Sequence, residues 1–169
     1  MTLFLYYLEG LYELINCKVW KYRYYSWTCW CNKSINIPSS WCHGLSGHLS
    51  SRITLKKYGY NDEFIDKEIK SAVKNIIDRG LNHNFCLCHG DLGNLLELFE
   101  SADILEDNVL REQVINVVHN YALKVEKENI LESIFKFEEN NGIMTGISGI
   151  GYVMLKILYP DVVTDVLSL

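Results

Sequence analysis

The sequence lacks the features that would point to a nucleic acid or a membrane. Its 16 Lys and Arg residues are outnumbered by 21 Asp and Glu, and no long basic run is present that could neutralise a phosphate backbone. The N-terminal apolar run, residues 3–8, is interrupted by Glu9 and Glu13, lacks a basic leader, and is far shorter than the ~20 residues that span a bilayer. We therefore expect a cytoplasmic protein with no signal peptide, no membrane span and no nucleic-acid partner.

The composition fits one globular domain preceded by a segment of a different kind. The chain has 169 residues, of which 49% are hydrophobic, enough to form a core. The first 30 residues hold ten of the 21 aromatic side chains but only two acids, and residues 19–33 follow neither a helical nor a strand period. We predict an irregular, aromatic-rich segment over residues 1–38, without an assigned role, and a separate domain over residues 39–169.

The six cysteines raise the question of a disulfide framework. Two of them are followed by the same His-Gly pair, the chain is too large to need covalent staples, and it has no export signal. A secreted disulfide protein is therefore the weaker alternative, and the cysteines indicate a reducing compartment and a metal. The six are Cys17, Cys29, Cys31, Cys42, Cys86 and Cys88.

Helical periodicity dominates after residue 40. Residues 61–79 place their apolar side chains on one stripe, with Asn61 or Asp62 available as N-cap and Gly80 as the C-terminal stop. The predicted stripe consists of Phe64, Ile65, Ile69, Ala72, Val73, Ile76 and Ile77. A second stripe runs through Leu110, Val114, Val117, Val118 and Tyr121.

A short glycine motif recurs three times. The stretches "CHGLSGHL" (42–49), "CHGDLGNL" (88–95) and "MTGISGIG" (144–151) each contain Gly-x-x-Gly and then begin an apolar run. The chain between them is long enough for an αα-hairpin in each unit, with inner helices that start near His48, Asn94 and Gly149. The first glycine permits a tight turn and the second a close approach. Stacking in an open solenoid or a closed ring would put equivalent loops on one face, so Cys42 and Cys88 should lie close together.

Two Cys-His pairs at equivalent loops offer four ligands of the kind that zinc prefers: Cys42, His43, Cys88 and His89. Four protein ligands would make a closed structural site, whereas three would leave a position open for water or substrate. The spacing leaves both possible. The alternative without a metal is that these cysteines are small buried hydrophobes.

Other candidates have weaker signals. Cys86 forms Cys-x-Cys with Cys88, and we predict that it packs in the core. Cys29 and Cys31 have no histidine partner and stay unassigned. Asp91 could orient His89, although capping a helix is the role that we predict for it. The remaining histidines are predicted to be structural or solvated: His48, His83 and His119.

These motifs resemble a known family. "SWCHGLSG", "CLCHGDLGN" and "GIMTGISGIGYVMLKILYP" are similar to the closing motifs of the lanthionine synthetase C-like cyclases, most nearly the C-terminal end of the cyclase domain of class II lanthipeptide (lantibiotic) synthetases. The resemblance covers residues 39–169. It implies an all-α fold that is part of an α/α toroid, a ring of inner and outer helices with zinc at the mouth.

The resemblance also implies a site and a reaction. It makes Cys42, Cys88 and His89 the zinc ligands and His43 a pocket-lining residue. The implied enzyme adds a cysteine thiolate of a dehydrated precursor peptide to dehydroalanine or dehydrobutyrine, which forms lanthionine or methyllanthionine. The family's acid/base His and Asp, most of its repeats and the dehydratase half of class II enzymes have no match here. We therefore expect a truncated, weakly active or inactive fragment, with the missing N-terminal part of a synthetase as a possible partner. The alternatives are a non-catalytic zinc-binding helical module and a peptide-binding scaffold.

Overall fold

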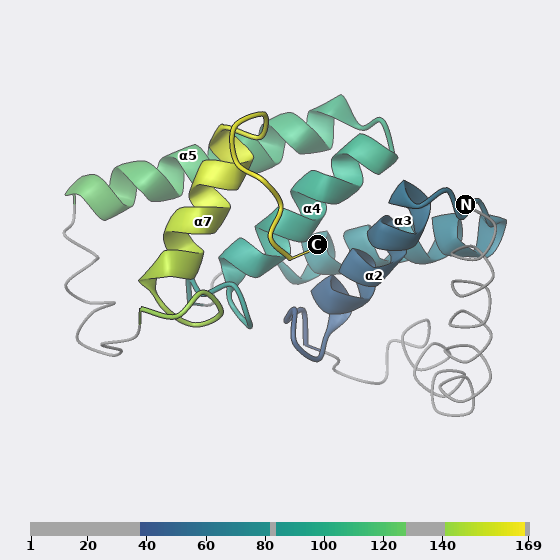
Figure 1. The fold of residues 1–169 in the computed structure, drawn as a ribbon, viewed down its shortest axis with the longest axis horizontal. Coiled ribbons are helices and arrows are strands. Elements are labelled where there is room, and N and C mark those ends of the chain that lie inside the picture. The colour runs from purple at the N-terminus through teal and green to yellow at the C-terminus, as the bar shows by residue number, and fades with distance from the viewer. Residues whose placement is uncertain (1–37, 82–83, 128–140, 168–169) are drawn as a thin grey trace. The chain divides into compact units, whose positions relative to one another are not determined.

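The computed structural model describes residues 38–81, 84–127 and 141–167 (Figure 1). These ranges contain the helices α2 (Leu45–Lys57), α3 (Glu63–Arg79), α4 (Asp91–Ile104), α5 (Asn108–Lys127) and α7 (Ile147–Leu158), and no strand. The prediction of an all-α fold is confirmed for this part of the chain. The predicted irregular segment lies outside the described residues except for Pro38, and so do Cys17, Cys29, Cys31 and His83.

The helices pair as the glycine repeat predicts. Helices α2, α4 and α7 each follow a repeat loop, and α4 contacts both α2 and α7 (Figure 1). Helix α3 packs on α2 and α4, while α5 packs on α4 and α7. Helix α4 therefore contacts each of the four other helices that the structure describes, and most of its side chains are buried. Because α2, α4 and α7 start at the same edge, the three repeat loops lie together at the lower edge of Figure 1.

Helix α3 forms where its stripe and caps predict. The Asp62 side chain accepts a hydrogen bond from the backbone N–H of Phe64 at 2.8 Å, and Gly80 ends the helix with a positive φ of 72°. Five members of the predicted stripe are buried: Ile65, Ile69, Ala72, Val73 and Ile76. Ile77 is 50% exposed, so its assignment to the core was wrong.

The second glycine of each motif is required by close packing of backbone. A Cβ atom on Gly47 would lie 1.9 Å from the carbonyl oxygen of Trp41, and one on Gly149 would lie 1.7 Å from that of Ile143. A Cβ atom on Gly93 would likewise lie 1.9 Å from the carbonyl oxygen of Leu87. The first glycine is also demanded by space: Gly44 has an extended backbone, but its Cβ would lie 2.2 Å from the Pro38 oxygen.

The inner helices begin two or three residues earlier than predicted. They start directly after the first glycine, at Leu45, Asp91 and Ile147. The second glycine therefore lies in the first helical turn, where the helix backbone presses on the loop that precedes it. The apolar run therefore begins inside the helix, after its first residues, and does not mark the position where the helix starts.

Buried polar groups join the inner and outer layers. Arg52 of α2 forms an ion pair with Glu68 of α3, and both side chains are almost fully buried. The His48 ring lies 3.6 Å from the other Glu68 oxygen. Burial raises the pKa of Glu68, but the bonds from His48 and Arg52 outweigh burial and leave it lowered. Between the inner helices, the Ser46 hydroxyl donates to Asn94 Oδ1 at 2.6 Å.

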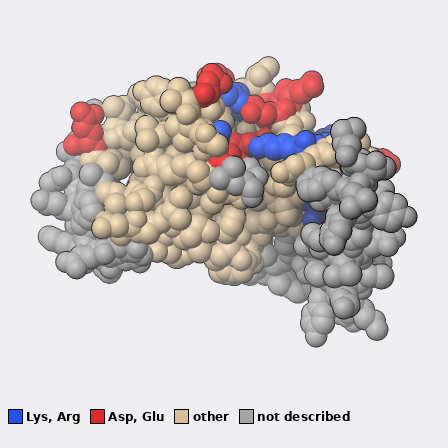
Figure 2. All heavy atoms as spheres, viewed as in Figure 1, with Lys and Arg blue, Asp and Glu red and all other residues tan. Residues whose placement is uncertain are grey.

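The surface of the described residues is unevenly charged. Figure 2 shows most of the visible Lys, Arg, Asp and Glu side chains gathered along the upper edge, away from the three repeat loops. Within the described ranges, no helix has the length and hydropathy needed to cross a membrane.

Candidate functional site

The three repeat loops are joined to one another by main-chain hydrogen bonds. The backbone N–H groups of Trp41 and Cys42 both donate to the Cys88 carbonyl oxygen, at 2.9 and 3.2 Å. The Cys88 N–H in turn donates to the Met144 carbonyl oxygen at 2.8 Å. Cys42 and Cys88 therefore lie close together, as the repeat predicts, and backbone hydrogen bonds join their two loops directly.

The two thiols have different surroundings. The Cys42 side chain is exposed, whereas Cys88 is half-buried, with the Cys42 thiol as a neighbour that affects its ionisation. Burial, together with the neighbouring Cys42 and Cys86, raises the pKa of the Cys88 thiol to about 11. Cys88 is therefore a neutral thiol at pH 7, and a nearby cation would be needed to stabilise its thiolate.

The two candidate imidazoles are placed differently. His43 Nδ1 lies 2.9 Å from Cys42 Sγ. The His89 side chain is exposed, and its backbone N–H approaches Cys86 Sγ at 3.4 Å. In the part of the chain that the structure describes, no three His, Cys, Asp or Glu side chains are grouped so that they could hold a metal ion.

The donor chemistry nevertheless suits zinc. Two adjacent thiols with an imidazole beside one of them are the soft and borderline ligands that zinc prefers. What the described geometry lacks is a third ligand turned toward both sulfurs. The set Cys42, Cys88 and His89, with His43 lining the pocket, stays a prediction.

Neighbouring residues support the Cys88 loop. Cys86 is buried, in agreement with the predicted packing role. Asp91 is the first residue of α4 and Gly90 is its N-cap, with no side-chain cap bond, so the predicted capping role was wrong. Instead, the buried Asp91 carboxylate accepts a hydrogen bond from the Tyr121 hydroxyl of α5 at 3.1 Å. Burial, together with Asp91, raises the pKa of Tyr121 to about 12.

A buried carboxyl group behind the Cys42 loop was missed from the sequence. Trp41 Nε1 donates to Glu97 Oε1 at 3.0 Å, and Glu97 on α4 is only 3% exposed. Burial raises the pKa of Glu97 to about 8, against the effect of hydrogen bonds with Ser50 and Trp41. The signal was present in the sequence as a single acid within the apolar run "LLELF", residues 95–99.

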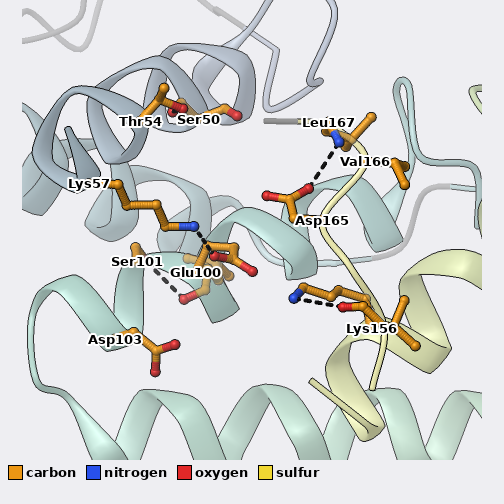
Figure 3. Close-up of polar contacts among 12 residues, drawn as sticks. Ser50, Thr54, Lys57, Glu100, Ser101, Asp103, Lys156, Asp165, Val166 and Leu167 are labelled. Atoms are coloured by element: carbon orange, nitrogen blue, oxygen red, sulfur yellow. Dashed lines mark hydrogen bonds and ion pairs between the residues drawn. The ribbon is translucent and has the colours of Figure 1, made fainter. Parts of the chain in front are cut away.

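The C-terminal segment adds further charge near α4. The Asp165 carboxylate accepts a hydrogen bond from the Tyr152 hydroxyl at 3.1 Å. It accepts a second one from the Leu167 N–H at 3.0 Å (Figure 3). Lys57 of α2 pairs with Glu100 of α4 in the same region (Figure 3). Both Glu100 and Asp165 act on Glu97 electrostatically and favour its protonated form.

Comparisons with known proteins show which family the chain is similar to. The family model described as "Lanthionine synthetase C-like protein" matches residues 7–168, so the match includes most of the segment that precedes our predicted boundary at residue 38. The chain is 34% identical over 165 residues to the Lacticin 481/lactococcin biosynthesis protein LcnDR2 of Lactococcus lactis subsp. lactis. That alignment covers 89% of this chain but 18% of the relative's length. No solved structure matches.

The helical hairpins and the family match together confirm the predicted fold class, an all-α partial α/α toroid. The family model covers far more than half of the sequence, and its match includes all three glycine motifs. The chain belongs to the lanthionine synthetase C-like family.

Proposed function

We propose that this chain is part of a zinc-dependent cyclase that forms lanthionine and methyllanthionine rings in lantibiotic biosynthesis. In this reaction the sulfur of a peptide cysteine bonds to the β carbon of dehydroalanine or dehydrobutyrine, and a proton is added to the α carbon. The partner is a dehydrated precursor peptide. The observation that carries the proposal is the junction of the Cys42 and Cys88 loops through the Cys88 carbonyl oxygen, in a chain of this family.

The proposed ligands are Cys42, Cys88 and His89, with His43 lining the pocket beside Cys42. Zinc bound there would supply a positive charge that keeps the substrate thiol as the nucleophilic thiolate. The same charge would stabilise the thiolate of Cys88, whose pKa is raised mainly by burial. The exposed Cys42 side chain leaves one side of the thiol pair open to a peptide.

Zinc content of single alanine variants tests the ligand set. We expect Cys42→Ala, Cys88→Ala and His89→Ala to lose zinc, and His43→Ala to retain it. His119→Ala serves as the matched control, since His119 is an exposed histidine of α5. If His43→Ala lost zinc as completely as Cys88→Ala, the open, three-ligand site would be wrong.

A specific contact favours a second candidate, a non-catalytic zinc module. The His43 ring is beside the Cys42 sulfur at 2.9 Å, so it could serve as a fourth protein ligand and close the site. A closed site would tie the two loops together without binding a substrate thiol. Titration of the zinc-loaded chain with a small thiol distinguishes the two: an open site gains a sulfur ligand, detectable by X-ray absorption, whereas a closed site does not.

We further propose that this stretch of chain, without the rest of a synthetase, cyclises slowly or not at all. The reaction needs a base for the thiol and an acid for the α carbon, and no described residue is assigned to either role. Assistance of this kind is typically worth ~10²–10⁴-fold in rate. Incubation with a dehydrated precursor peptide and zinc, followed by alkylation of free thiols and mass spectrometry, measures ring formation directly. Rates equal to those of a complete synthetase would contradict this proposal.

A further inference from the structure

We propose that Glu97 is a positioning residue that holds the Cys42 loop through Trp41 and thereby sets the separation of the Cys42 and Cys88 thiols. The inference rests on the proposed function in one respect only, the role of the two thiols as zinc ligands. Its structural content, that one buried carboxyl group fixes the approach of two loops, stands apart from zinc and from catalysis.

Helix α4 is the common reference for both loops. Cys88 lies three residues before Asp91, the first residue of α4, so the helix carries this thiol by chain continuity. Glu97 lies in the second turn of the same helix and accepts the hydrogen bond from Trp41 Nε1. Trp41 directly precedes Cys42, and both of their backbone N–H groups donate to the Cys88 carbonyl oxygen. The Cys42 loop is therefore held at two points: the Trp41 side chain bonds to α4, and the backbone of Trp41 and Cys42 bonds to the loop that leads into α4.

The environment of Glu97 argues for a specific role. The residues on both sides of it, Leu96 and Leu98, are buried apolar side chains, and an acid costs free energy in such a place unless its polar atoms are paired. Its carboxyl group accepts a hydrogen bond from Trp41 in the Cys42 loop and interacts with Ser50 in α2, the helix that follows this loop. The Glu97 carboxyl group thus connects α4 to the Cys42 loop by a hydrogen bond. An apolar side chain at this position could pack there but could not make this connection.

The hydrogen bonds can be retained or removed selectively. In Glu97→Gln the amide oxygen can still accept from Trp41 Nε1 and the amide nitrogen can donate to Ser50. Glu97→Leu keeps similar volume but has no acceptor, and Trp41→Phe removes the donor from the other side. Glu100→Gln is the matched control: it is the same substitution in the next turn of α4, at a residue that pairs with Lys57.

Cross-linking of the two thiols reports their separation without zinc or substrate. The metal-free full chain is treated with dibromobimane, which joins two thiols that lie close together. The linked tryptic peptides 34–52 and 80–111 are then quantified by tandem mass spectrometry, with fragment ions that distinguish a link at Cys88 from one at Cys86. We expect the Cys42–Cys88 cross-linking rate to fall about tenfold in Glu97→Leu and in Trp41→Phe, as the loss of one buried hydrogen bond implies. Glu97→Gln and Glu100→Gln should react at the wild-type rate.

Circular dichroism identifies any variant that fails to fold, and if Glu97→Leu does so, Trp41→Phe decides the question. Wild-type cross-linking in folded Trp41→Phe would overturn the inference, as would a Glu97→Gln variant as slow as Glu97→Leu. A chain that shows the expected cross-linking pattern but binds no zinc would refute the proposed function and leave this inference standing. A chain that binds zinc but whose cross-linking does not change when Glu97 or Trp41 is replaced would refute this inference and leave the proposed function standing.

Discussion

Replacing Glu97 with Gln should remove a large part of the pH dependence of folding stability. The pKa of Glu97 is raised from 4.5 to about 8 in the folded chain. Between these values the unfolded chain has lost this proton while the folded chain keeps it, so the folded state loses stability as pH rises from about 4.5 to about 8. At about 1.4 kcal/mol per pH unit the accumulated loss is on the order of 5 kcal/mol. Domains are typically stable by only ~5–15 kcal/mol, so the effect is large.

Urea unfolding followed by circular dichroism at pH 5, 6, 7, 8 and 9 measures this dependence. The wild-type free energy of unfolding should decline toward pH 8. Above that pH the contribution of Glu97 to it should no longer change. Glu97→Gln should be close to the wild type at pH 5 and more stable than it at pH 8, because its side chain carries no charge to bury. Glu112→Gln, at an exposed position of α5, should follow the wild-type curve. Parallel curves for the wild type and Glu97→Gln would refute the reasoning.

Two further predictions use matched pairs, with urea midpoints as the measurement. Gly149→Ala should destabilise the fold by about 3 kcal/mol or more, since its Cβ would collide with backbone, whereas Gly151→Ala, two residues along α7 in open space, should stabilise it by up to ~1 kcal/mol. If both substitutions changed the free energy of unfolding equally, helix propensity rather than backbone contact would explain the effect of replacing Gly149. Glu68→Ala should cost about 3–5 kcal/mol because it leaves Arg52 buried without its ion-pair partner, while Lys74→Ala, in an exposed pair, should cost less than ~1 kcal/mol. The Glu68 contribution, with its lowered pKa, should be present above about pH 4.5 and lost as pH falls below it.

The features that sequence predicted well are those encoded by nearby residues. Helix α3 has its apolar stripe, its Asp62 cap and its Gly80 stop within one continuous stretch, and the structure reproduces the cap, the stop and most of the stripe. The close approach of Gly47 to the Trp41 carbonyl oxygen likewise involves residues six apart, and its recurrence in three motifs made it recognisable. Loop equivalence then predicted the meeting of Cys42 and Cys88.

The features that sequence missed depend on partners far along the chain. Nothing near Asp91 indicates that Tyr121 of α5 will donate to it, so an acid at a helix start was taken for a cap. Glu97 is likewise explained only by Trp41, 56 positions earlier, which becomes its neighbour when α2 packs on α4. Which imidazole approaches the thiols depends on side-chain rotation, which residue spacing does not determine.

The main-chain bonds between the repeat loops separate the architecture of the site from its chemistry. Carbonyl and N–H groups are the same in every residue except proline, so the junction at the Cys88 backbone does not depend on which side chains stand at positions 42, 43, 88 and 89. Ligand types at these positions can therefore be exchanged, by evolution or by design, while the loops keep their register. The three loops could therefore hold a different set of ligands. Carboxylates that suit a harder ion could replace the sulfur-rich set for zinc while the helices that follow the loops stay unchanged.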